Sequence, residues 1–408
     1  MNSNRIVNQS NKLNNHGSYI MTSSFRVLDN HALSYTINAY DSYDIIIFRK
    51  PLNIERHDAY FEVIKEDLVK TLSAFTKVHY VNDLKEIFSL INGDIILDKA
   101  YLNEEKSIEK QLINFVTSKG NGYTVIESNV TVPVSYASNK EEYSARTIRS
   151  KIHRHLYQFI DPVLDDYPST MMEKKALRHC YDFIENKLSN YHLKNHPELD
   201  FTSELSVYLK YGIISPIRIY ILLEDNIDPN KEVFLEELIV RRELAYNFVY
   251  YNHQYDNFSH ITYEWAYNTM EVHKLDMREY LYTIEDYIQF NTHDPYFNAA
   301  MKEMVFLGKM HGYMRMYWCK KIIEWSPNYK FAYDTAIYLN NYYFYDGYTP
   351  NGFTGVAWCF GKHDRAWTER DIFGKLRYMN ANGLKRKFNI DDYVKKIENE
   401  VSNHVKSK

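Results

Sequence analysis

The chain has 408 residues, more than a single hydrophobic core ordinarily supports, so its length predicts two domains. Its 49 basic and 53 acidic side chains give a formal net charge of −4, which excludes wholesale coating of a polyanion but not a local basic groove. Three widely spaced cysteines exclude a disulfide framework or a zinc motif and are typical of a reducing compartment, so we expect an intracellular, cytoplasmic protein.

The N-terminal part of the chain predicts an α/β domain. Residues 1–18 are polar and rich in asparagine, without the apolar segment of a signal peptide, and we expect them to form a disordered lead-in. Over residues 19–135, five β-rich runs alternate with helical patterns. The β-rich runs are YIMTSSF, YDIIIFRKP, KVHYV, GDIILD and GYTVIES. Strands separated by crossover helices predict a parallel, Rossmann-like sheet.

The rest of the chain has the periodicity of helices. Residues 136–170 include the strongly basic run EEYSARTIRSKIHRHL and are expected to form a connector. Residues 171–408 are helical in pattern almost throughout, which predicts an all-α second domain. Within it, Asp294 is a predicted N-cap, Pro295 the first helical residue, and Ser326 the end of the same long helix. No stretch is long and apolar enough for a membrane span, so we expect no membrane partner.

Residues that carry chemistry concentrate between Lys309 and Asn380. Four of the chain's five tryptophans lie in this stretch, beside Arg315, Asp346 and Arg377. Rigid aromatic side chains next to paired charges point to a redox or base-stacking site. The same residues also have a plainer reading, because an arginine–aspartate pair can be a structural salt bridge and a tryptophan can belong to the core.

A second candidate site is the segment TSELSVYLKYG. It places Thr202, Ser203 and Ser206 at the predicted start of a helix, where hydroxyls and free backbone N–H groups can hold a pyrophosphate. From these residues alone, an ordinary helix cap is the favoured interpretation. His363 and Asp364 with His311 lack a further ligand at helical spacing, so we expect no metal site.

The order of several motifs resembles that of the photolyase and cryptochrome family, and class II cyclobutane pyrimidine dimer photolyases most of all. These motifs are TSELSVYL, EELIVRREL, KMHGYMRMYW, YDGYTPNGFTGVAW and FGKLRYMN. The resemblance implies a deoxyribodipyrimidine photo-lyase, a carbon–carbon lyase that splits cyclobutane pyrimidine dimers in UV-damaged DNA by electron donation from photoexcited, reduced FAD. It also implies that the protein is a monomer.

The resemblance implies two groups of FAD contacts. The segment 202–206 would hold the flavin diphosphate, with Tyr191 nearby. Arg315 and Asp346 would lie against the isoalloxazine ring, because a guanidinium stabilises the anionic reduced flavin and needs a carboxylate to hold it. Asn340 and Asn351 are both candidates for the amide that faces flavin N5, and the class II pattern favours Asn340.

The resemblance also implies the lesion contacts. Glu237 would hydrogen-bond a pyrimidine carbonyl and steady the dimer radical anion, with Glu236 as the fallback for that role. Trp358 would line the pocket of the flipped dimer, and Arg377 would insert near the lesion. Further basic residues are expected to contact DNA, chiefly its phosphates. These residues are Arg241, Arg242, Lys385, Arg386 and Lys387.

An electron relay to the flavin is the point where this chain departs from the family. Members of the family use a tryptophan at the position of Trp318 and a second one in a WNAA motif, but this chain reads FNAA, with Phe297 in that place. Because phenylalanine is much harder to oxidise, we expect slow or rerouted photoreduction, whereas repair needs only flavin that is already reduced. The candidates for the relay are Trp318, Trp325, Tyr282, Tyr296 and Tyr317.

Three functional questions stay open at this point. Altered strand ends and a compact first domain leave the presence of an antenna chromophore undecided. The alternative function is a cryptochrome-like blue-light sensor that binds FAD without repair, but the presence of Glu237, Trp358 and Arg377 favours repair. A third reading, a helical protein that stacks single-stranded nucleic acid on its tyrosines, would give a colourless protein.

Overall fold

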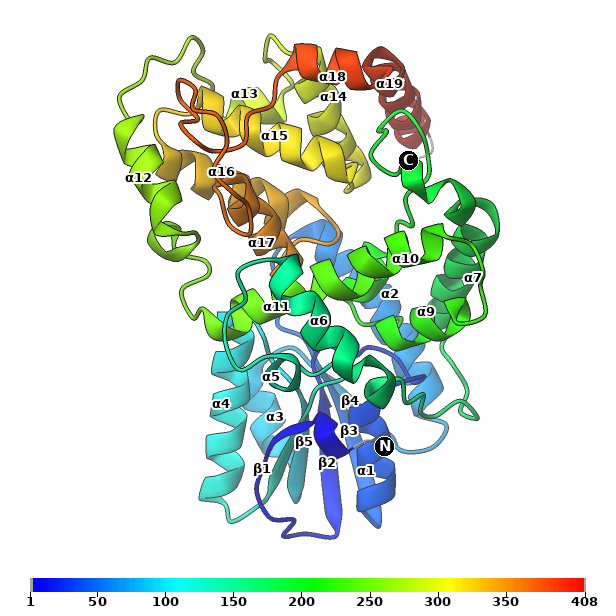
Figure 1. Cartoon of the computed structure of the whole chain (residues 1–408). Coiled ribbons are helices and arrows are strands. Elements are labelled where there is room, and N and C mark those ends of the chain that lie inside the picture. Colours follow the sequence, from blue (N-terminus) through cyan, green and yellow to red (C-terminus); the bar gives the residue numbers. More distant parts are fainter. Residues whose placement is uncertain (1–2, 407–408) are drawn as a thin grey trace. The chain divides into compact units, whose positions relative to one another are not determined.

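The computed structural model describes residues 3–406, which form two compact units (Figure 1). The first unit takes the described residues up to Leu188 together with Ser203–Tyr251, and the second takes Ser189–Thr202 and the described residues from Asn252 onward. The domain boundaries predicted at residues 135 and 170 were placed where strand patterns give way to helical ones, whereas the two units are defined by contacts within the folded chain. The predicted boundaries therefore stay predictions.

The first unit contains a six-stranded sheet whose order is β1-β6-β5-β2-β3-β4. The strands are β1 (Ile6–Gln9), β2 (His16–Met21), β3 (Ser42–Phe48), β4 (Lys77–Val81), β5 (Asp94–Asp98) and β6 (Tyr123–Ile126). All neighbours pair in parallel except β1, which runs antiparallel to β6. The five predicted strands and the predicted fold class are therefore confirmed, with one antiparallel edge strand added.

Helices cover the sheet and extend beyond it in the first unit. They are α1 (His31–Ala39), α2 (Glu55–Leu72), α3 (Leu84–Leu90), α4 (Asn103–Ser118), α5 (Val134–Ala137), α6 (Ala145–His155), α7 (Met171–Asn186), α8 (Ser206–Lys210), α9 (Pro216–Leu223), α10 (Asn230–Leu235) and α11 (Arg242–Tyr251). Leu112 and Val116 of α4 and Ile87 of α3 pack on Ile46 and Leu97 of the sheet. In Figure 1, α3 and α4 cover one face of the sheet and α1 lies against the other.

The predicted disordered lead-in is wrong for the residues that the structure describes. Strand β1 pairs with β6, and the fully buried Arg5 precedes it. The Arg5 guanidinium donates to Asp161 Oδ1 at 3.1 Å and to four backbone carbonyls at 2.7–3.2 Å. Those carbonyls belong to Glu127, Val130, Thr131 and Phe159. A polar composition suggested disorder, but a buried arginine that saturates its donors fixes the segment. Residues 1–2 lie outside the described part of the chain.

The second unit is helical. Its helices are α12 (Glu264–Val272), α13 (Ile284–Ile288), α14 (Pro295–Lys302), α15 (Gly312–Trp325), α16 (Tyr329–Tyr343), α17 (Pro350–Cys359), α18 (Ala381–Lys387) and α19 (Ile390–Lys406). Asp294 caps α14 as predicted, because its side chain accepts the backbone N–H groups of Tyr296 and Phe297. The long predicted helix is nevertheless broken. A π-helical turn, Glu303–Leu307, ends at Gly308, whose φ is +68°, and α15 then begins under the His311 cap.

Within residues 3–406, none of the helices combines the length and the apolar character that crossing a bilayer requires.

Asp94, the first residue of β5, ties loops together at the amino end of the sheet. One carboxylate oxygen accepts the backbone N–H groups of Leu13 at 2.8 Å and Asn14 at 3.2 Å. The other accepts Asn14 Nδ2 and the Gly122 backbone N–H, each at 2.6 Å. Burial alone raises the pKa of Asp94, but the hydrogen bonds from Asn14, Gly122 and Leu13 outweigh it and hold the pKa below its ordinary value.

Replacing Asp94 with asparagine is expected to lower the free energy of unfolding at pH 7 by about 2 kcal/mol, because an amide cannot accept all four hydrogen bonds. The folded pKa lies below the unfolded value of about 3.9, so the stabilisation is present above that value and is lost as pH falls through the folded pKa. Urea denaturation of both proteins at neutral and acidic pH measures the difference. A gap of the same size at both pH values would contradict the role of the ionised carboxylate.

Candidate functional site

Glu236 and Glu237 lie at the start of a π-helical turn, Glu236–Arg241, in the first unit. Arg149 of α6 holds Glu236 in a bidentate pair, with Nε–Oε2 and Nη2–Oε1 distances of 2.9 and 2.7 Å. Glu237 is more exposed, and its Oε1 lies 3.4 Å from Arg241 Nε. π-Helical turns frequently occur at functional sites. The geometry therefore favours Glu237 over Glu236 as the carboxylate that can meet a ligand.

Arg242 is buried, which argues against the DNA contact that we predicted for it. Its Nη2 donates to the Asn129 carbonyl at 2.8 Å and to the Tyr246 hydroxyl at 3.0 Å, and the guanidinium lies over the Tyr246 ring. The alternating charges of this helix resemble a solvated face in the sequence. The fold instead turns Arg242 inward, and Arg241 is the exposed arginine of the pair.

Arg315 and Asp346, which are 31 positions apart in the sequence, form an ion pair in the second unit. Arg315 Nη2 lies 3.0 and 3.1 Å from the two Asp346 oxygens, and Nε donates to the Met310 carbonyl at 3.1 Å. The guanidinium stacks over the Phe344 ring at 3.9 Å. Because the Arg315 side chain keeps 29% of its surface exposed, the positive charge is oriented and still accessible. Such a cation fits an anionic conjugated ring system.

Asn340 lies six residues before Asp346, near the end of α16, and its side chain is buried. Its Nδ2 donates to Asn341 Oδ1 at 2.9 Å, and a Cβ at Gly352 would approach this nitrogen to 2.8 Å. Gly352 therefore allows α17 to pack closely on the amide. Asn351 is instead exposed on the first turn of α17. Its burial, in contrast to the exposed Asn351, supports the preference for Asn340.

The hydroxyl-rich segment does not form the helix cap that its sequence suggested. Helix α8 begins at Ser206, its N-cap residue is Leu205, and no side chain caps it. The preceding Glu204 has a φ of +50°, and the Ser203 carbonyl lies 2.9 Å from His179 Nε2. Ser203 and Ser206 belong to the first unit, whereas Thr202 and the buried Tyr191 belong to the second. Their role at a diphosphate stays a prediction.

Trp358 and Arg377 are connected through the loop that follows α17. The Trp358 ring packs edge-on against His363 at 5.9 Å, and the next residue, Asp364, lies 3.4 Å from Arg377 Nε through Oδ2. Asp364 Oδ1 also accepts the Trp367 indole N–H at 3.2 Å, and Arg377 stacks over the Trp367 ring at 4.6 Å. The two predicted lesion residues therefore lie against neighbouring residues of one loop, Trp358 through a ring contact with His363 and Arg377 through an ion pair with Asp364.

Sequence reasoning did not predict the roles of three residues near Trp358 and Arg377. Asp364 pairs with Arg377, Trp367 stacks on Arg377, and Lys320 bonds the end of α17. Lys320 is buried, and its Nζ donates to the Cys359 carbonyl at the end of α17 at 2.5 Å. Burial lowers the pKa of Lys320. A lysine inside the helical run MYWCKKIIEW was the available signal, because a buried lysine must have a partner.

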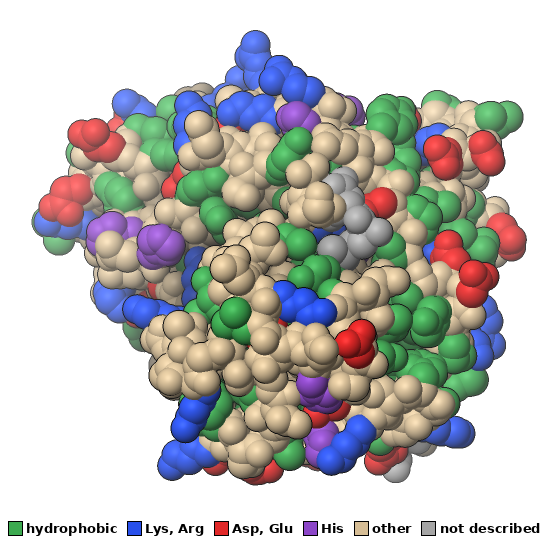
Figure 2. Space-filling model, turned by 90° about the horizontal axis from the view of Figure 1, so that it is seen from below, with side chains coloured by type: hydrophobic (Ala, Val, Ile, Leu, Met, Phe, Trp, Pro, Cys, Tyr) green, Lys and Arg blue, Asp and Glu red, His purple; other side chains and the backbone are tan. Residues whose placement is uncertain are grey.

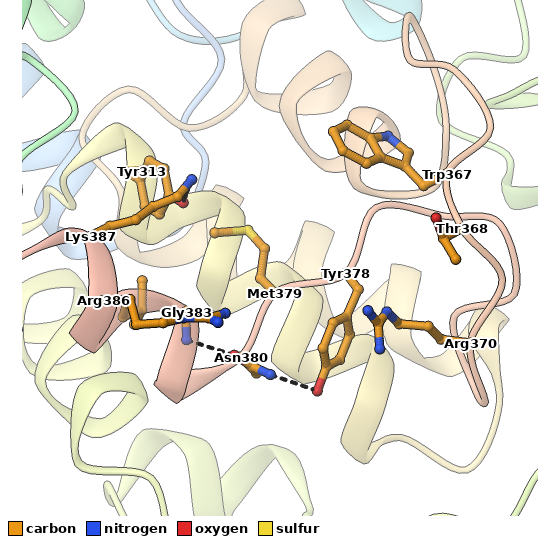
Figure 3. Close-up of a pocket in the computed structure, with 11 residues that line it drawn as sticks. Tyr313, Trp367, Thr368, Arg370, Tyr378, Met379, Asn380, Gly383, Arg386 and Lys387 are labelled. Atoms are coloured by element: carbon orange, nitrogen blue, oxygen red, sulfur yellow. Dashed lines mark hydrogen bonds between the residues drawn. The ribbon is translucent and has the colours of Figure 1, made fainter.

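A cavity of about 340 Å³ opens beside Trp367 (Figure 3). Trp367, Arg370 and Tyr378 line one side, and Arg386 and Lys387 of α18 line the other. Lys387 Nζ also lies 3.2 Å from the Tyr313 hydroxyl. Aromatic rings beside arginines and a lysine can stack bases and contact phosphates.

Three basic side chains gather at the end of α18. Lys385, Arg386 and Lys387 follow one another at the end of α18, whereas Figure 2 shows acidic and basic side chains interspersed on the face that it draws. This distribution agrees with the modest net charge and a local basic groove. No group of three or more potential metal ligands occurs among residues 3–406.

Trp318 and Trp325 are both buried on α15, and Phe297 lies next to the second of them. The Trp318 indole N–H donates to Met301 Sδ at 3.0 Å, and Met301 is one turn after Phe297 on α14. The Phe297 and Trp325 rings lie 5.1 Å apart. Phe297 therefore contacts Trp325 directly, and its place in a relay stays a prediction.

Comparisons with known proteins give relatives over most of the chain. It is 47% identical over 307 residues to the deoxyribodipyrimidine photo-lyase of Methanothermobacter thermautotrophicus, covering 67% of this chain and 68% of that protein. It is 34% identical over 385 residues to the protein of the same name from Arabidopsis thaliana, covering 79% and 77%. No protein-family model matches the chain.

The fold also resembles solved structures. The archaeal photolyase from Sulfolobus tokodaii, described with two FAD molecules, matches with a TM-score of 0.71 and 15% identity, over 93% of this chain and 89% of that one. At this identity the match concerns the fold alone, a mostly parallel sheet followed by a helical region.

Proposed function

Because this chain belongs to the deoxyribodipyrimidine photo-lyase family, we propose that it binds FAD and UV-damaged DNA and splits cyclobutane pyrimidine dimers in light, as a class II photolyase. The observation that carries the proposal is that the second unit contains two arginines, each held by an aspartate. Arg315 is held by Asp346, and Arg377 is held by Asp364. The first pair fits a flavin ring, and the second, with Trp358, fits an extruded pyrimidine dimer.

When bound and excited by light, reduced FAD would supply the electron that breaks the two carbon–carbon bonds of the dimer and would then recover it, so the reaction would cause no net oxidation or reduction. Arg315 and Asn340 orient the ring, and Asp346 keeps the guanidinium in place. Trp358 provides a wall for the extruded bases, which offsets part of the unstacking cost of a few kcal/mol. Arg377 fills the space near the lesion, and Glu237 hydrogen-bonds a pyrimidine carbonyl.

The experiment that tests this proposal follows thymine absorbance in UV-irradiated oligothymidine with the purified, dithionite-reduced protein. We expect the absorbance to recover under near-UV or blue light and not in the dark. A yellow, FAD-loaded protein without recovery would contradict repair and favour the light-sensor alternative. A colourless protein would contradict FAD binding itself.

Replacing Glu237 with alanine is expected to lower the yield of dimer splitting roughly 10-fold, because a hydrogen bond to a charged group contributes about 1.5–3 kcal/mol. Affinity for damaged DNA should change much less, since the bond strengthens only when the dimer carries negative charge. Splitting per absorbed photon at saturating DNA measures the effect. Glu236→Ala is the matched control, because Arg149 already holds that carboxylate. An equal loss in both variants would contradict the assignment to Glu237.

A further inference from the structure

Tyr282 and His293 form a hydrogen-bonded pair in the second unit. The Tyr282 hydroxyl lies 2.8 Å from His293 Nδ1, and the His293 backbone N–H donates to the same hydroxyl oxygen at 3.0 Å. When the imidazole carries its proton on Nε2, Nδ1 accepts the phenolic proton, while the phenolic oxygen accepts the backbone N–H. The pair is therefore arranged as an acid and its base.

The pair is in direct contact with the buried Trp325. The Tyr282 and Trp325 ring centroids lie 5.4 Å apart at 75°, and the Tyr282 backbone N–H donates to the Trp325 carbonyl at 3.2 Å. The centroid of the His293 ring lies 5.0 Å from that of Trp325. Tyr280 stacks on His293 at 3.8 Å, and both of these side chains are exposed. An electron can thus reach Trp325 from Tyr282, while a proton can leave His293 into water.

A phenol that loses an electron becomes a very strong acid. Its oxidation is therefore much easier when a base within hydrogen-bond reach takes the proton in the same event. We propose that Tyr282 is the terminal electron donor to oxidised Trp325 and that His293 is the base that accepts its proton. The inference rests on the proposed function, because photoexcited oxidised flavin, acting through Trp318, is the oxidant that would generate oxidised Trp325.

The step balances in electrons and protons. One electron passes from Tyr282 to oxidised Trp325, the phenolic O–H bond breaks, and the proton forms a new bond to His293 Nδ1. The products are a neutral tyrosyl radical, an intact tryptophan and an imidazolium, which then releases a proton to water. A thiol reductant in solution returns one hydrogen atom to the radical. In this scheme Tyr282 and Trp325 provide the surface end of the relay beside Phe297.

Two other candidate tyrosines, Tyr317 and Tyr296, are less suited to be the terminal electron donor. The Tyr317 hydroxyl donates to Asp294, which already caps α14, and Tyr317 is fully buried. Burial and the Asp294 carboxylate raise the pKa of Tyr317 far above its ordinary value. Because Asp294 is buried as well, a proton passed to it does not reach water directly. Tyr296 donates to Asp391 at 2.8 Å. A carboxylate is a weaker base than a neutral imidazole.

Two spectroscopic measurements on the full chain test the inference. Flash excitation of the FAD-loaded protein, followed by electron paramagnetic resonance, should give a neutral tyrosyl radical whose formation slows in D₂O. Tyr282→Phe should abolish this signal. His293→Leu should lower its yield roughly tenfold and remove the isotope effect, as expected when a positioned base is lost. Tyr280→Phe and Tyr296→Phe are matched controls that should keep the signal.

The second measurement needs no flavin. Nitrogen-15 resonances of labelled histidines in the dark protein should show His293 with an unprotonated, hydrogen-bonded Nδ1, and Tyr282→Phe should remove that hydrogen-bond shift. An unchanged tyrosyl signal in Tyr282→Phe, or equal yields in the wild type and His293→Leu, would overturn the inference. Dimer splitting by dithionite-reduced Tyr282→Phe should equal that of the wild type. Its absence in both proteins would instead refute the proposed function.

Discussion

Replacing Asp346 with alanine is expected to lower light-driven repair roughly 100-fold and to release most of the FAD during purification, a loss equivalent to about 2.7 kcal/mol. Asp346 accepts Arg315 Nη2 through both carboxylate oxygens, at 3.0 and 3.1 Å. Without it, the guanidinium over the Phe344 ring keeps the hydrogen bond to the Met310 carbonyl but loses its charged partner. Breaking a fully buried pair costs about 3–5 kcal/mol, and the partial exposure of Arg315 lowers that figure.

The ratio of flavin to protein, read from absorbance, and repair under saturating light measure the effect of Asp346→Ala. Asp334→Ala is the matched control, because it removes a carboxylate from an exposed ion pair. Asp334 and its partner Lys330 both lie on α16. The control should keep both flavin and repair. Stoichiometric flavin and normal repair in Asp346→Ala would contradict the assignment of the Arg315–Asp346 pair to the flavin ring.

Replacing Arg377 with alanine is expected to weaken binding of dimer-containing DNA roughly 30-fold, or about 2 kcal/mol, because the side chain is held ready for the lesion. Asp364 fixes its Nε, and the Trp367 ring supports its guanidinium. Affinity for undamaged DNA should fall much less, since a contact near the lesion carries specificity whereas phosphate contacts do not.

Competition titrations with damaged and undamaged duplexes at two salt concentrations measure this difference. Arg365→Ala is the matched control, because Arg365 stacks on the same Trp367 ring at 5.1 Å but its exposed side chain could serve at most a phosphate. Arg365→Ala should weaken the binding of damaged and undamaged duplexes by the same factor, as loss of one phosphate contact does. Equal losses for the two duplexes in Arg377→Ala would contradict its role at the lesion.

The fold was predictable wherever local pattern and tertiary structure agree. Alternation of β-rich runs with helical runs predicted the five parallel strands, and the Asp294–Pro295 pair predicted the start of α14. Strand β1 was not predictable, because its four residues, Ile6–Gln9, lie in an otherwise polar segment and become a strand only through pairing with β6, more than a hundred residues later. The break at Gly308 was hidden because the helical periodicity continues across it.

The candidate site was predictable from residue type but not from geometry. Arg315 and Asp346 were chosen by resemblance, and the structure brings them within 3.0 Å. Arg242 misled because a run of charges on a helix is typical of a solvated face. His293 gave no local signal at all, since its partner Tyr282 lies eleven positions earlier, and only the folded chain places Nδ1 at the hydroxyl.

The most direct test of the account uses a duplex that contains a single cyclobutane thymine dimer and the dithionite-reduced, FAD-loaded protein. Chromatography of the strand before and after illumination reports whether the dimer has been split into two thymines. The account predicts complete, light-dependent conversion with many turnovers and none in the dark. Bound FAD and bound damaged DNA with no conversion in light would contradict it.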